Sequence, residues 1–245
     1  MPSLSSQSPV DLNGKSSSLR LMLDDADYSH WQQWLPLGLF YGVTTNPLLL
    51  ERAGVPCQVE RLTDLATAAF ELGAQEVQLQ TWGDDEAQYV QVGKKLSAID
   101  PERIVVKVPA TQVGTSAAAT LIRSGVRVTL TAVFAEHQAL IAAAIGADYA
   151  APYLGRIHDT GRKGCEVLTA MQQALDGIGS PTRLLVASIR RVEDITLLAT
   201  QRLNTFTIST AIAAQLFQVQ ATIDATIAFE QAALRSLQTG FRQAN

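Results

Sequence analysis

One lysine stands inside an otherwise apolar run of β-branched residues. Lys107 belongs to Ile-Val-Val-Lys-Val-Pro at residues 104–109, a pattern typical of a strand covered on both faces. An ammonium group in such surroundings is costly, and burial favours the neutral amine. That amine attacks a ketone to give a carbinolamine and then an iminium ion, which draws electrons from an adjacent C–C bond. Lys107 is therefore a candidate for Schiff-base chemistry.

Two structural roles compete with this chemical one. Lys107 could form a buried ion pair with a carboxylate such as Asp24. It could also extend along apolar surface and place its ammonium group in water at the end of the strand. The strand alone does not separate these roles from catalysis.

Lys107 must be positioned by a fold in which strands and helices alternate. Five amphipathic stretches predict helices at residues 58–72, 85–99, 136–145, 192–203 and 211–237. Eight β-rich runs predict strands at residues 20–24, 39–45, 76–81, 103–108, 126–131, 148–153, 183–188 and 205–209. Eight βα units predict a single-domain (β/α)₈ TIM barrel over residues 19–245, preceded by a disordered tail over residues 1–18. An open doubly wound sheet is the alternative, but no GxGxxG follows the first strand.

Composition excludes several classes of partner. The net charge is -4 and no run of basic residues occurs, so we expect neither nucleic-acid nor membrane-surface binding. No apolar run is long enough to cross a bilayer, and the first residues lack the apolar core of a secretory signal. Cys57 and Cys165 form no disulfide or metal-binding pattern. We expect a cytoplasmic protein.

Polar residues gather where the predicted strands end. In barrels of this kind the C-terminal ends of the strands carry the chemistry. A group of polar side chains at those ends favours the catalytic role of Lys107. Those residues are Asp24, Thr44, Thr45, Asn46, Gln78, Gln80, Thr129, Thr131, Tyr153, Arg156, Ser188, Arg190, Ser209 and Thr210.

Four segments resemble the transaldolase family, and within it the small fructose-6-phosphate aldolase-like branch. They are Leu-Asp at residues 23–24, GVTTNP at 42–47, VKVPAT at 106–111 and APYLGRI at 151–157. The resemblance extends from about residue 21 to residue 230. It implies a Schiff-base enzyme that acts on a sugar phosphate and associates with copies of itself through its C-terminal helix. No metal or organic cofactor is expected, because the iminium ion is itself the electron sink.

The resemblance also implies a role for each matching residue. Lys107 matches the lysine that forms the Schiff base, and Asp24 matches the aspartate that acts as acid and base. Asn46, with Thr45 beside it, matches the residues that bind the dihydroxyacetone unit. By the same resemblance, a catalytic water is contacted by Thr131 and Gln80. The substrate phosphate is bound by Arg156, Ser188 and Arg190.

Some of these assignments have structural alternatives. Gln78 lies two residues before Gln80 on the same strand face, which leaves open which of them reaches the water. Arg156 could form a surface salt bridge instead. Ser188 could be the N-cap of the helix predicted at residue 192.

Three positions favour an aldolase over a transaldolase. Tyr153, Gln80 and Ala151 match the aldolase-like branch, where many transaldolases carry Phe, Glu and Ser. A phenol can donate a hydrogen bond to water or to the enamine, whereas a phenyl ring cannot; Tyr153 could also be a packing residue. A transaldolase, and a barrel that binds a sugar phosphate without turnover, are the alternatives.

Other positions depart from the family pattern. Asp25 adds a second carboxylate beside Asp24, and we expect Asp24 to point inward and Asp25 outward. Thr129 could change how substrate hydroxyl groups are recognised, and Trp82 could narrow the acceptor side, so the substrate could differ from fructose 6-phosphate.

Overall fold

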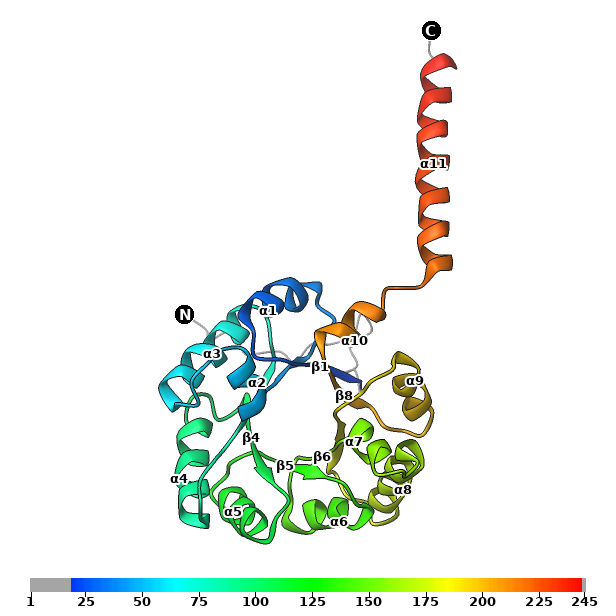
Figure 1. Cartoon of the computed structure of the whole chain (residues 1–245). Helices are drawn as coiled ribbons and strands as arrows, with labels where there is room; N and C mark the ends of the chain where they lie inside the picture. Colours follow the sequence, from blue (N-terminus) through cyan, green and yellow to red (C-terminus); the bar gives the residue numbers. More distant parts are fainter. Residues whose placement is uncertain (1–18, 244–245) are drawn as a thin grey trace.

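Eight parallel strands close into a barrel (Figure 1). The computed structural model describes residues 19–243, with side chains through residue 236, and the predicted tail at residues 1–18 lies outside the described residues. Each strand pairs with the next along the chain, and β8 pairs with β1. The strands are β1 (Arg20–Asp24), β2 (Gly42–Thr44), β3 (Glu76–Gln80), β4 (Ile104–Pro109), β5 (Val128–Val133), β6 (Tyr149–Pro152), β7 (Arg183–Val186) and β8 (Thr205–Ile208). The predicted barrel is confirmed.

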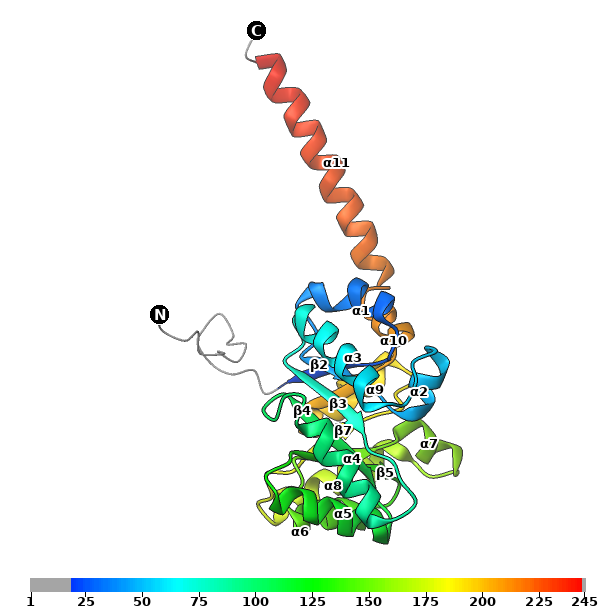
Figure 2. The same cartoon turned by 90° about the vertical axis from the view of Figure 1, so that its left-hand side faces the viewer.

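Helices cover the outside of the barrel (Figures 1 and 2). Their apolar faces pack on the strands, as in α3, where Leu62, Ala66 and Ala69 are fully buried. Among the described residues, no helix is both long and apolar enough to span a membrane. The helical elements are α1 (Tyr28–Trp34), η1 (Leu35–Leu37), α2 (Pro47–Arg52), α3 (Val59–Glu71), α4 (Glu86–Ser97), α5 (Gln112–Arg123), α6 (Glu136–Ile145), α7 (Leu154–Asp159), α8 (Gly164–Gly177), α9 (Val192–Thr200), α10 (Thr210–Gln215) and α11 (Gln220–Gln243).

The C-terminal segment differs from the single helix predicted over residues 211–237. The chain forms α10 and α11 with a break between them, so that prediction is wrong. At the break, the N–H groups of Leu216 and Phe217 bond to the carbonyls three residues earlier, which tightens the turn and ends α10. The Phe217 ring stacks on Trp34 with 6.2 Å between centroids. The chain is thus held against α1 before α11 extends away from the barrel (Figure 2).

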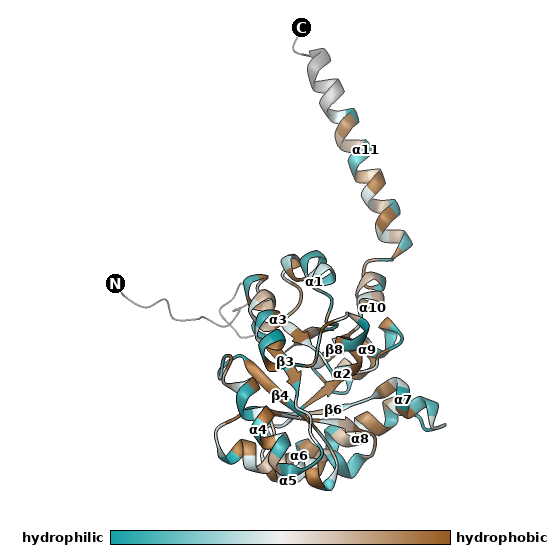
Figure 3. Cartoon of the chain, turned by 60° about the vertical axis from the view of Figure 1, so that its left-hand side comes forward, coloured by the Kyte–Doolittle hydropathy of each residue, from teal (hydrophilic) through white to brown (hydrophobic). Residues whose placement is uncertain are grey.

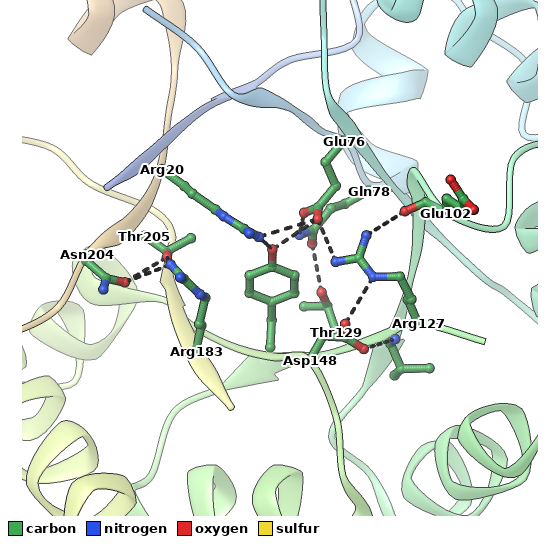
Figure 4. A network of polar contacts seen from close by, with 12 residues as sticks. Arg20, Glu76, Gln78, Glu102, Arg127, Thr129, Asp148, Arg183, Asn204 and Thr205 are labelled. Carbon is green, nitrogen blue, oxygen red and sulfur yellow. Dashed lines mark hydrogen bonds and ion pairs between the residues drawn. The ribbon is translucent and has the colours of Figure 1, made fainter. Parts of the chain in front are cut away.

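A network of charged and polar side chains fills the N-terminal end of the barrel (Figure 4). Glu76, the first residue of β3, has no exposed surface. It accepts hydrogen bonds from Arg127 at 2.7 Å, Tyr149 at 3.0 Å and Gln78 at 2.9 Å, and Arg20 lies 3.7 Å away. We call these five residues the barrel floor.

The barrel floor is closed by further contacts. Arg20 also bonds the Tyr149 hydroxyl, and Arg127 bonds Asp148 at 3.0 Å. Burial, and then the negative charge of Glu76, raise the pKa of Tyr149 above its ordinary value, so its phenol stays a donor. Above this layer lie Met22, Val105 and other buried apolar groups. The interior is therefore packed from the floor to the C-terminal ends of the strands.

Candidate active site

A cavity of about 390 Å³ opens at the C-terminal ends of the strands. The predicted site residues line it, except for Thr45 and Arg190. This is the end where barrels of this kind carry their chemistry. The lining residues are Asp24, Asn46, Pro47, Leu48, Leu49, Arg52, Gln80, Lys107, Pro109, Thr131, Ala132, Tyr153, Arg156, Ala187 and Ser188.

Lys107 is the buried amine of this cavity. Its residue is 4% exposed, and its Nζ donates to the main-chain carbonyl oxygen of Thr45 at 2.7 Å. No carboxylate within the described part of the chain forms an ion pair with it. The geometry thus differs from both structural alternatives, the buried pair with Asp24 and the lysine extended into water. A backbone oxygen can hold the amine in place without neutralising it by a counter-charge.

Asp24 is held by a short chain of hydroxyl groups. Thr44 Oγ1 donates to Asp24 Oδ1 at 2.7 Å, and Thr207 Oγ1 lies 2.6 Å from Thr44 Oγ1. Asp25 turns away from the cavity, accepts the N–H groups of the next loop and lies 2.8 Å from the His30 ring. The predicted orientations, Asp24 inward and Asp25 outward, are confirmed.

Depth in the barrel distinguishes the two glutamines. Both point inward from β3, but Gln80 lines the cavity whereas Gln78 is fully buried below it. Gln78 donates to Glu76 at 2.9 Å and accepts from Thr129 at 2.8 Å. Gln80 is thus the residue available to a ligand. Thr129 and Trp82 do not line the cavity.

Thr131 and Tyr153 form a hydroxyl pair on the cavity wall. Their oxygens are 2.9 Å apart. The Tyr153 ring meets Phe134 edge to face, with 5.5 Å between centroids. Packing therefore fixes the ring while the phenol faces the cavity. Packing of Tyr153 against Phe134 therefore leaves its hydroxyl at the cavity.

Asn46 and Thr45 have different roles although they are adjacent. Asn46 caps α2, because its Oδ1 accepts the N–H groups of Leu48 and Leu49 at 3.0 and 3.1 Å. Its amide NH₂ is left for the cavity that it lines. The side chain of Thr45 is buried outside the lining, with its hydroxyl 3.4 Å from the Gln78 carbonyl. Thr45 contributes to the site through its main-chain carbonyl oxygen, which accepts the hydrogen bond from Lys107.

The predicted phosphate-binding residues are not all brought together. Arg156 and Ser188 line the cavity. Arg190 instead makes a bidentate pair with Asp159, at 2.7 and 2.6 Å, and the bonds from Arg190 lower the pKa of Asp159. The helix after β7 has Arg191 as its N-cap, so the interpretation of Ser188 as that N-cap is wrong. Arg156 makes no ion pair with any described residue, contrary to the salt-bridge alternative.

Sequence reasoning missed the wall formed by α2. Leu48, Leu49 and Arg52 line the cavity from this helix. The signal was present, because Asn46 followed by a proline is typical of a helix N-cap and first turn. Ala132 was also missed, and it shares a left-handed backbone with Ser188, φ 58° in each. Such strained backbone is concentrated at functional sites.

Comparisons with known proteins identify the family of this chain. A protein of Thermus thermophilus named "Probable transaldolase" is 34% identical over 183 residues, which cover 73% of this chain and 81% of that protein. A Geobacillus protein of the same name is 30% identical over 199 residues, covering 81% and 91%. A flavocytochrome b2 variant shares the fold alone, with a TM-score of 0.54, 13% identity and coverage of 82% of this chain and 59% of its own. The sequence model of the transaldolase/fructose-6-phosphate aldolase family matches residues 21–244, and this chain belongs to that family, whose members are Schiff-base enzymes of the aldolase and transaldolase type.

Proposed function

We propose that the protein is a class I aldolase that reversibly cleaves fructose 6-phosphate, or a related ketose phosphate, to dihydroxyacetone and glyceraldehyde 3-phosphate. The observation that carries this proposal is the placement of Lys107. Its amine lies buried in a cavity that also holds one carboxylate, Asp24, and one unpaired guanidinium group on the predicted phosphate side, Arg156. These are the groups that cleavage of a phosphorylated ketose through an iminium ion requires.

The proposed cleavage follows from these positions. The Lys107 amine adds to C2 of the ketose, and loss of water gives the iminium ion. Asp24 accepts the proton of the C4 hydroxyl, the C3–C4 bond breaks, and its electron pair moves to the iminium nitrogen to leave an enamine. Glyceraldehyde 3-phosphate departs with the phosphate that Arg156 bound. The Asn46 amide holds the three-carbon unit that remains.

The Thr131–Tyr153 pair supports release of free dihydroxyacetone. The enamine must be protonated at C3, and water must then cleave the iminium bond to Lys107. A phenol that is held by packing and hydrogen-bonded at 2.9 Å can donate to that water, and Gln80 adds an amide beside it. The alternative is a transaldolase, in which the enamine attacks a second aldose, and the names of the relatives favour it. A binding barrel without turnover is the second alternative.

The variant Tyr153→Phe tests whether the enamine is released as dihydroxyacetone or transferred to a second aldose. We expect the variant to release free dihydroxyacetone from fructose 6-phosphate about 10²-fold more slowly, because one donor to the catalytic water is lost. Transfer to erythrose 4-phosphate should fall far less. The measurement is product analysis with and without that acceptor.

A matched variant tests whether the effect is specific to the Tyr153 hydroxyl group. Tyr89→Phe removes a phenol from α4, outside the cavity, and should leave both rates unchanged. Wild-type enzyme that releases no dihydroxyacetone without an acceptor, yet transfers the unit readily, would establish the transaldolase instead.

We also propose that the protein forms a homo-oligomer through α11 and works in the cytoplasm, where phosphorylated sugars are retained. Hydrophobic residues recur along α11 (Figure 3), and Ile223, Ile227 and Leu234 are 44%, 52% and 59% exposed. An apolar groove formed by Trp34, Leu37, Leu39 and Phe217 lies at the base of the helix. Exposed apolar surface of this kind marks an association site.

Ile227→Asp should therefore convert the oligomer to a monomer, because a carboxylate in an apolar interface is not solvated. Sedimentation velocity measures the change. The control is Ile178→Asp, since Ile178 follows α8 and is 60% exposed; this variant should keep the wild-type mass. A wild-type monomer would rule out this proposal.

A further inference from the structure

Two buried hydroxyl groups lie behind Asp24, and the proposed cleavage does not use them. They belong to Thr44, the last residue of β2, and Thr207, on β8, which are 0% and 1% exposed. Neither residue lines the cavity. The strands β2 and β8 are the two neighbours of β1, and Asp24 ends β1 in register with Thr44. Any effect of these hydroxyl groups on a ligand must therefore pass through Asp24.

The number of protons fixes the direction of the hydrogen bonds. An ionised carboxylate only accepts, so Thr44 donates its single hydroxyl proton to Asp24 Oδ1, at 2.7 Å. Toward Thr207, whose Oγ1 lies 2.6 Å away, the Thr44 hydroxyl group can then only accept. Thr207 is thus the donor at the start of a directed chain that ends on the carboxylate. We call Thr44 and Thr207 the hydroxyl chain.

The hydroxyl chain makes the two carboxylate oxygens of Asp24 unequal. Oδ1 accepts from Thr44, whereas Oδ2 has no hydrogen-bond partner within the described part of the chain. Asp24 lines the cavity, so Oδ2 is the oxygen available to a ligand. In the proposed cleavage the proton of the C4 hydroxyl group therefore moves to Oδ2. Oδ1 of the neutral acid still accepts from Thr44, so this proton stays on the side of the substrate for the reverse step.

This arrangement acts on bond cleavage and not on the steps before it. A general base must be ionised and within hydrogen-bond reach of the proton that it removes. A hydroxyl donor to Oδ1 stabilises the ionised carboxylate and restricts its rotation. Addition of the Lys107 amine at C2 does not involve the C4 hydroxyl group. Loss of the hydroxyl chain should therefore slow C–C cleavage and leave Schiff-base formation intact.

We propose that Thr44 and Thr207 are positioning residues for the C–C cleavage step, and that the hydroxyl chain holds Asp24 ionised with Oδ2 toward the C4 hydroxyl group. The proposal rests on the proposed function for the identity of that hydroxyl group. It applies equally to an aldolase and to a transaldolase, because both enzymes cleave the same bond.

The variant Thr44→Val tests the hydroxyl chain, since valine keeps the branched shape and lacks the hydroxyl group. We expect kcat for cleavage of fructose 6-phosphate to fall about 10- to 100-fold, a part of what a general base contributes, with KM no higher than in the wild type. Quenching turnover with borohydride should then trap a different adduct. The wild-type chain should gain the mass of a reduced dihydroxyacetone unit. The variant should gain that of the whole hexose phosphate, because the iminium ion accumulates before cleavage.

Further variants identify the hydroxyl group as the cause. Thr44→Ser keeps the donor and should restore the wild-type kcat and adduct. Thr207→Val should lower kcat less than Thr44→Val does. The double variant should be no slower than Thr44→Val, because Thr207 acts only through Thr44.

The matched control is Thr205→Val. Thr205 is fully buried and lies on the same face of β8 as Thr207, two residues earlier. Its hydroxyl group donates to Asn204 at 3.1 Å, away from Asp24. This variant should keep the wild-type kcat and adduct.

Three outcomes would overturn the proposal. The first is a folded Thr44→Val variant with the wild-type kcat and adduct, and the second is a Thr44→Ser variant as slow as Thr44→Val. The third is a double variant in which the two effects multiply, which would mean that the threonines act separately. If Thr44→Val does not fold, an unchanged kcat and adduct in Thr207→Val would refute the hydroxyl chain. A wild-type protein that gains no adduct would refute the proposed function, and this proposal with it.

Discussion

Replacing Lys107 with methionine is expected to lower the turnover of fructose 6-phosphate by about 10⁴-fold or more, because Lys107 is the one lysine among the described residues that line the cavity. Methionine has a similar length and places no charge in the interior, where Lys107 is 4% exposed. We therefore expect the free energy of unfolding to stay within about 1 kcal/mol of the wild-type value. The loss of activity would then report chemistry and not unfolding.

Borohydride trapping provides the decisive measurement. With fructose 6-phosphate the wild-type chain should gain the mass of one reduced dihydroxyacetone unit, and peptide mapping should place it on Lys107. The matched control is Lys94→Met, an exposed lysine on α4 that should be trapped like the wild type. An adduct that persists in the Lys107→Met variant would assign the Schiff base to another lysine.

Replacing Glu76 with alanine is expected to have the largest effect on stability. This carboxylate has no exposed surface and is the shared acceptor of Arg127, Tyr149 and Gln78. Its removal leaves buried cationic and polar groups without their partner, and breaking such a buried pair costs about 3–5 kcal/mol. Urea denaturation of the purified variant measures this loss.

The control for this prediction is Glu71→Ala. Glu71 is exposed at the end of α3, and its removal should change the free energy of unfolding by less than about 0.5 kcal/mol. Glu76→Gln should fall between the two variants, since it keeps the volume and loses the charge. If Glu76→Ala costs no more than Glu71→Ala, the barrel floor does not stabilise the fold as proposed.

Much of the fold follows from local patterns in the sequence. Buried parallel strands require continuous apolar runs, which is why all eight were predicted and why Lys107 stood out within one of them. The strand-end rule then indicated Asp24, Gln80 and Tyr153. Alternation along β3 shows that Gln78 and Gln80 share a face, but not how deep the cavity reaches. That depth depends on the packing of other strands.

Long-range pairing explains what the sequence did not reveal. The partner of Arg190 is Asp159, 31 residues earlier, and no local pattern indicates that this pair withdraws Arg190 from the cavity. The break between α10 and α11 depends on Phe217 meeting Trp34, far away in the chain. The strand-end rule does not indicate Arg52, because Arg52 lies at the far end of a helix.

The barrel floor also constrains the order of events in a catalytic cycle. Glu76, Met22 and Val105 have no exposed surface, so within the described part of the chain packed side chains close the N-terminal end of the barrel. Substrates and products must therefore enter and leave through the opening at the C-terminal ends of the strands, in front of Lys107. In the proposed reaction, the aldehyde formed first must then leave this opening before water or an acceptor sugar can enter. In the proposed reaction, we therefore expect an aldehyde that leaves slowly to inhibit the enzyme, because it occupies the opening through which water or the acceptor sugar enters.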